Sequence, residues 1–172
     1  MTDERRAWRD AAAVRAEFDA AFARREAPPE PTAALLAIRV GSEPLALRVL
    51  DVGGLVPIRH VMAVPSRRPE LLGVVGLRGE VVPLFGLARL VHGRPDESPR
   101  WMVLAGGSER VAFAFTTFDG HLRVPVAELR SAPGEPSVRH VRELYTGSPP
   151  RPVLDMSSLV AAATARDERE SP

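Results

Sequence analysis

The feature that most constrains this chain is a series of short apolar runs, beginning near Ala33, that are separated by glycine, proline and serine residues. Runs of this length with turn residues between them indicate β-strands rather than helices. Roughly ten such runs at spacings of about 8–12 residues favour a barrel or a sandwich. We expect strands at residues 35–40, 45–50, 56–64, 73–77, 80–84, 101–105, 110–118, 122–126, 138–144 and 152–156.

Two short helices are expected within this β-rich region. Residues 86–91 can supply one or two helical turns, and residues 157–165 read as a closing helix. Either Asp155 or Ser157 is available as the N-cap of the closing helix. The charged tail 166–172 is expected to fray.

The first 26 residues predict an amphipathic helix. Trp8, Phe18 and Phe22 recur at helical spacing on one face, with charged residues on the other. A proline-rich linker at 27–32 ends the helix, because proline removes a backbone donor. We expect the aromatic face to be an interface, most favourably with the chain's own β-domain. A homodimer and a partner protein remain as alternatives.

Composition removes several functional classes. The 23 basic and 22 acidic residues leave a net charge of +1, which argues against a broad nucleic-acid-binding surface. All the basic residues are arginine, and cysteine is absent. Lysine-dependent nucleotide binding, Schiff-base chemistry and cysteine nucleophiles are therefore excluded. The N-terminus resembles no secretory signal, and no apolar run approaches the ~20 residues of a membrane helix, so we expect a cytoplasmic protein without membrane insertion.

No catalytic or metal-binding pattern emerges. The four histidines are widely spaced, and no serine lies in a GxSxG elbow. The glycines at 73, 76 and 79 lack the dinucleotide-binding spacing. We therefore expect no enzyme activity, no cofactor and no metal.

The most informative segment is Leu71–Gly93, in which two apolar strands flank one charged turn. Arg78 lies between Leu77 and Gly79 at the tip of this hairpin. A guanidinium on a rigid turn is a common anchor in protein interfaces. The alternative is an ordinary solvated arginine.

The block GVVGLRGEVVPLFGL at residues 73–87 resembles the CheW-like domain of bacterial chemosensory arrays. The order of flanking segments is also similar: 45–49 and 65–73 upstream, 111–118 and 153–160 downstream. The resemblance spans about residues 33–163, and we take 33–165 as the CheW-like domain.

The resemblance implies a mainly β fold of two intertwined five-stranded barrels. It also implies a non-catalytic adaptor that couples a chemoreceptor to the regulatory domain of a histidine kinase, clustered in a receptor array. The partner-binding residues that we carry over are Leu77, Arg78, Gly79, Val52 and Leu55.

Four polar positions of the family pattern are replaced here. Gly76 stands for an asparagine, and Gly54, Gly86 and Thr116 stand for acidic residues. These losses favour a second hypothesis, in which a divergent adaptor binds a cytoskeletal, chromosome-organising or other scaffold protein. A third hypothesis, a small β-barrel enzyme or ligand binder, requires a polar pocket that the sequence does not indicate.

Overall fold

The computed structural model describes residues 30–95, 98–132 and 138–165. The expected N-terminal helix with Trp8, Phe18 and Phe22, most of the linker and the tail 166–172 lie outside these residues. Within the described residues, no helix has the length and apolarity needed to cross a membrane.

One sheet has six strands drawn from both ends of the β-region. Its strands are β1 (Thr32–Val40), β2 (Glu43–Arg48), β8 (Thr117–Pro125), β9 (Leu129–Ser131), β10 (Val141–Tyr145) and β11 (Arg151–Leu154). They are ordered β8-β1-β2-β11-β10-β9, and only the β2–β11 pair is parallel. The chain enters this sheet, leaves it and returns, so the sheet combines strands from both ends of the β-region.

The second sheet has five strands from the middle of the chain. They are β3 (Val52–Pro57), β4 (Leu71–Leu77), β5 (Glu80–Gly86), β6 (Trp101–Ala105) and β7 (Ala112–Phe115). The order β3-β6-β7-β5-β4 makes β3 and β4 the two edge strands. The mainly β class is thus confirmed, although the sheets have six and five strands rather than five each.

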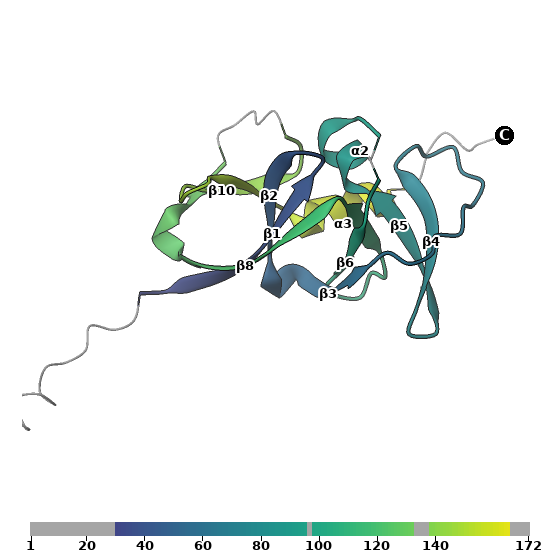
Figure 1. Cartoon of the computed structure of the whole chain (residues 1–172), viewed down its shortest axis with the longest axis horizontal. Helices are drawn as coiled ribbons and strands as arrows, with labels where there is room; N and C mark the ends of the chain where they lie inside the picture. Colours follow the sequence, from purple (N-terminus) through teal and green to yellow (C-terminus); the bar gives the residue numbers. More distant parts are fainter. Residues whose placement is uncertain (1–29, 96–97, 133–137, 166–172) are drawn as a thin grey trace, which may run out of the picture. The chain divides into compact units, whose positions relative to one another are not determined.

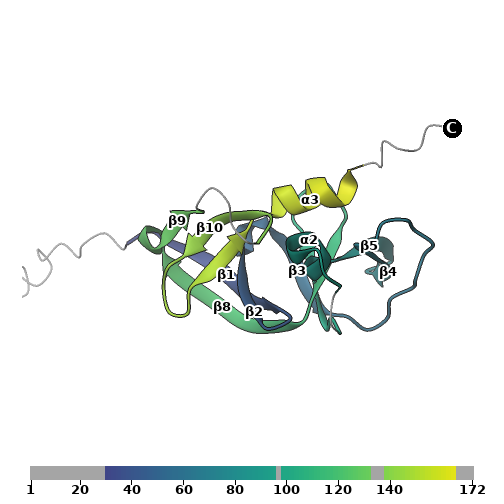
Figure 2. The ribbon, with the colours of Figure 1, turned by 90° about the horizontal axis from the view of Figure 1, so that it is seen from above.

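In the part of the chain that the structure describes, two α-helices lie where the two sheets meet (Figures 1 and 2). Helix α2 (Leu87–His92) directly follows β5, and α3 (Met156–Thr164) follows β11. Asp155 is the N-cap of α3, because its Oδ1 accepts hydrogen bonds from the backbone N–H groups of Ser157 and Ser158. Two 3-10 turns, Val49–Asp51 and Val126–Glu128, also lie within the described residues.

The largest core cluster joins both sheets and both helices. Ile38 of β1, Phe113 of β7, Leu87 of α2 and Leu159 of α3 are fully buried members. A smaller cluster lines one face of the five-stranded sheet and includes Val75, Val82 and Met102. Because the main cluster is shared, removing apolar volume from it weakens both sheets together.

Several strand boundaries predicted from the sequence were wrong, most clearly those of the predicted strands 56–64 and 110–118. The predicted strand 56–64 is instead β3 at 52–57 followed by a loop, and Gly53 and Gly54, which precede the predicted strand, lie inside β3. There a register shift brings Gly53 against β6, where an added Cβ would lie 2.8 Å from the Ala105 carbonyl oxygen. These glycines permit a bulge with close backbone approach, not a turn.

The predicted strand 110–118 divides at Thr116 into β7 and β8, which belong to different sheets. The Thr116 backbone N–H donates to the Arg39 carbonyl, and its Oγ1 accepts from the Gly41 N–H at 2.9 Å. These contacts hold Thr116 at the point where the chain passes from the five-stranded sheet to the six-stranded sheet. Strand β9 is only three residues long and was not predicted from the sequence.

Candidate functional site

The β4–β5 hairpin places Arg78 at an exposed two-residue turn. Leu77 pairs with Glu80 across the turn, and Arg78 and Gly79 have φ values of 51° and 83°. Two successive positive φ values are typical of the type I′ turn, whose twist matches that of the strands. The tight turn fixes the direction in which the hairpin presents the Arg78 side chain.

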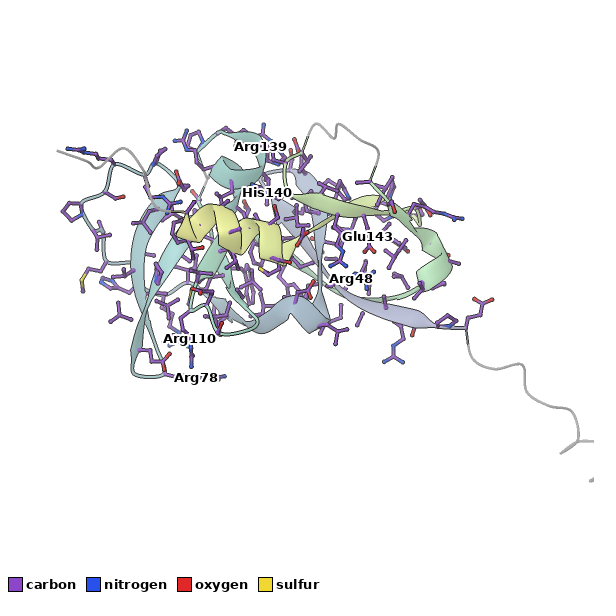
Figure 3. The ribbon with its side chains drawn as sticks, turned by 180° about the vertical axis from the view of Figure 1, so that it is seen from behind. Arg48, Arg78, Arg110, Arg139, His140 and Glu143 are labelled. Atoms are coloured by element: carbon purple, nitrogen blue, oxygen red, sulfur yellow. The ribbon has the colours of Figure 1, made fainter. Side chains whose placement is uncertain are left out.

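The Arg78 guanidinium has no ion-pair or side-chain hydrogen-bond partner among the described residues. Its neighbour Glu80 is paired, because Nη1 of Arg110 lies 2.8 Å from Oε2 of Glu80. Figure 3 shows Arg78 and Arg110 at this end of the molecule. The turn therefore presents an uncompensated positive charge to solvent.

An apolar groove of about 570 Å³ runs beside this hairpin. One wall is formed by four consecutive β4 residues, Val74–Leu77, and the other by the end of β3 and the loop after it. The floor reaches core residues Val75 and Met102, which are 3% and 4% exposed. The remaining lining residues are Val56, Pro57, Arg59, His60, Met62 and Val81.

The loop wall of the groove is anchored at two points. Met62 forms an isolated β-bridge with Val74, with both backbone N···O distances at 2.9 Å. Further along, the Arg68 guanidinium donates to the Ala163 and Ala162 carbonyls at the C-terminus of α3, at 2.6 and 2.8 Å. Arg68 also lies over the Phe85 ring, 5.1 Å from its centroid. These anchors hold the groove open in a defined shape.

The structure separates the site residues predicted from the sequence into two groups. Leu77 lines the groove, and Arg78 and Gly79 form the turn beside it. Val52 and Leu55 lie on β3 and are partly buried against the main core cluster. The β3 residues that reach the groove are instead Val56 and Pro57.

Sequence reasoning missed the groove itself, including exposed Met62 and Val81, which are 61% and 72% exposed. Side chains alternate along β5, so Val81 points outward where Val82 points inward. An outward-facing valine in the sequence could therefore have indicated an exposed apolar surface. The loop wall had no such signal, because its position depends on contacts with β4 and α3.

A second, shallower depression of about 410 Å³ lies between the Val49–Asp51 turn, residues 106–109 and α3. Leu50 on its rim is 90% exposed. Asp51 and Glu109 also line this depression, so its charge is opposite to that of the groove beside Arg78.

Two partly buried histidines pack within the fold. His92 lies 3.0 Å from Oε2 of Glu43, a close contact that lacks hydrogen-bond geometry, and burial lowers its pKa from 6.5 despite this carboxylate. Burial also lowers the pKa of His140, whose Nδ1 lies 2.8 Å from Oγ of Ser158. Among the described residues, no group of three or more acidic or histidine side chains could hold a metal ion.

Comparison with known proteins identifies relatives of the β-region. The family model described as "CheW-like domain" matches residues 34–164. The crystal structure of the scaffolding protein TtCheW from Thermoanaerobacter tengcongensis is similar, with a TM-score of 0.65 and 12% sequence identity. That similarity covers 73% of this chain and 90% of TtCheW and supports a shared fold. No curated protein matches the chain.

Proposed function

The chain belongs to the CheW-like domain family, and from this premise we propose that it is a non-enzymatic adaptor that couples a chemoreceptor to a histidine kinase. The observation that carries the proposal is the exposed Arg78, which has no side-chain partner among the described residues and lies on a rigid turn beside an apolar groove. Arginine beside apolar surface is a frequent centre of protein interfaces, since its planar group combines stacking with several hydrogen bonds.

In this proposal, Leu77, Arg78 and Gly79 form the primary contact. Leu77 supplies apolar surface, Gly79 permits the tight turn and Arg78 pairs with an acidic group of the partner. Val52 and Leu55 contribute from β3, either directly or by holding Val56 and Pro57 in position. The adaptor would work in the cytoplasm, clustered with its partners.

The proposal is tested by measuring binding of the purified chain to the receptor's cytoplasmic tip and to the kinase regulatory domain. We expect both to bind, and Arg78→Glu to weaken binding at least about 30-fold, as for a hot-spot arginine. Arg130→Glu, an equal charge reversal on exposed β9, is the matched control and should bind like the parent chain. Failure of the parent chain to bind either partner would contradict the coupling role.

An alternative partner is favoured by one specific observation. Gly54 and Gly76, where the family pattern has polar side chains, lie on the two edge strands of the same sheet. A surface changed at both edges suits a different protein, such as a cytoskeletal or chromosome-organising scaffold. If the chain binds neither chemosensory partner but retains an Arg78-dependent partner, this second role replaces the first.

A further inference from the structure

Neither the backbone conformation nor the space around position 76 requires a glycine there. It lies inside β4, its backbone is outside the left-handed region, and a Cβ built there would meet no atom within 4 Å. A strand interior disfavours glycine because of its large entropy loss, so such a residue often marks a close approach by another backbone or a ligand. Among the described residues, no backbone or side chain makes such a close approach to Gly76.

The backbone of Gly76 faces an open sheet edge. Val74 exchanges both of its backbone hydrogen bonds with Met62, on the side of β4 away from β5. Alternate residues of an antiparallel strand direct their N–H and C=O groups to the same side, so those of Gly76 point the same way. The described loop residues stop pairing at Met62, and β4 is an edge strand, so this side of Gly76 faces the groove.

The side-chain environment at this edge is apolar and uncovered. Val81 is the cross-strand neighbour of Gly76 and is 72% exposed. The groove beside it continues to Leu77 and Val56. An occupant that paired with Gly76 would place alternate side chains over Val81 and into this groove.

The charge at the rim is positive. This charge comes from two arginines: Arg59 lines the groove beside His60, and Arg78 follows Leu77 at its end. Among the described residues, none of these three side chains forms an ion pair or a side-chain hydrogen bond. An occupant that carries carboxylates at its ends is therefore complementary.

We propose that the groove binds an extended segment of a partner protein, which adds to the edge of β4 at Gly76. The segment has apolar β-branched residues at alternate positions and an acidic residue at its ends. A helix does not fit this role, because its backbone groups are already hydrogen-bonded and cannot pair with Gly76. The inference rests on the proposed adaptor function and specifies how one partner is held.

The test uses a capped synthetic peptide, DVTVTVD, titrated into the ¹⁵N-labelled full-length chain and followed by NMR. We expect saturable shifts at residues 74–77 and 59–62, with a Kd of roughly 0.1–1 mM for a short segment. We also expect slower hydrogen exchange of the Gly76 amide. The same peptide with alternate amides N-methylated should not bind, because it cannot donate to the strand edge.

Two substitutions test the site. Gly76→Thr should fold normally, since threonine favours strands and has open space here, and should weaken peptide binding at least about tenfold. Ser131→Thr on β9, the edge of the other sheet, is the control and should leave binding unchanged. Val81→Ser provides a second variant at an exposed position and should also weaken binding.

The inference is overturned if the peptide produces no shifts at about 1 mM, if the N-methylated peptide binds equally, or if Gly76→Thr binds like the parent chain. A chain that binds the receptor and kinase fragments but not the peptide overturns this inference alone. A chain that binds the peptide but neither fragment contradicts the coupling role alone.

Discussion

The buried guanidinium of Arg151 donates a hydrogen bond from Nη2 to Oδ2 of Asp119, at 2.8 Å, across the six-stranded sheet. Arg151 is the first residue of β11, and Asp119 lies in β8, three strands away in the sheet order. On the way, Nη1 of Arg151 contacts the carbonyl oxygens of Ile38 in β1 and Leu45 in β2. One side chain thus connects four strands.

We expect Asp119→Ala to destabilise the chain by about 3 kcal/mol, because it leaves the buried Arg151 charge without its partner. For a chain of this size, the expected fall in Tm is about 10 °C. Thermal unfolding followed by circular dichroism measures the change. Glu80→Ala breaks the exposed pair with Arg110 and should change stability by less than about 0.5 kcal/mol. Equal effects of the two substitutions would refute the role of the buried pair.

Stability should fall with acidification below about pH 6.5. Burial lowers the pKa of both His92 and His140 from 6.5, so the unfolded chain binds protons that the folded chain does not. Stability is therefore complete above the unfolded value and is lost as the pH falls through it toward the folded values. Comparing Tm at pH 7.5 and 5.5 tests this. The double substitution His92→Gln and His140→Gln should flatten the dependence, and an unchanged slope would assign it to other groups.

Arg78→Asn should keep or raise stability, by about 0.5 kcal/mol, while removing the guanidinium. Asparagine tolerates positive φ better than arginine, and Asn-Gly is the preferred sequence of a type I′ turn. Thermal unfolding and binding are measured on the same preparation. We expect a Tm at or above that of the parent chain together with weakened partner binding. A fall in both would make Arg78 part of the folded core of the hairpin.

Asp155→Ala should destabilise the chain by about 1 kcal/mol, because it removes the N-cap of α3. The Asp155 carboxylate accepts from two backbone N–H groups and from the Ser157 hydroxyl. Asp155→Asn retains an acceptor and should lose less. Urea unfolding resolves the difference, and a similar loss for both variants would show that the negative charge, not the acceptor, is what matters.

Local patterns were sufficient for much of the fold. Alternation and turn residues predicted the 80–84 and 101–105 strands, and the tight Arg78–Gly79 connection requires only two residues between apolar strands. The Asp155 cap was one of two local alternatives, and only the hydrogen bonds selected it. Resemblance of the 73–87 block supplied the family, which the family model confirms.

The candidate site could be predicted only in part, because its two walls come from separate segments of the sequence. Only the folded chain brings these segments side by side. The sequence by itself determined the hairpin, the exposed arginine at its tip and the mainly β class, since each depends on neighbouring residues. The tertiary structure alone decided that the loop after β3 stays beside β4, because Met62 and Arg68 hold it to partners found elsewhere in the fold. The tertiary structure also decided that Gly76 faces open space. A strand lies at the edge of a sheet when no further strand pairs with its outer side, and that depends on how the rest of the chain folds.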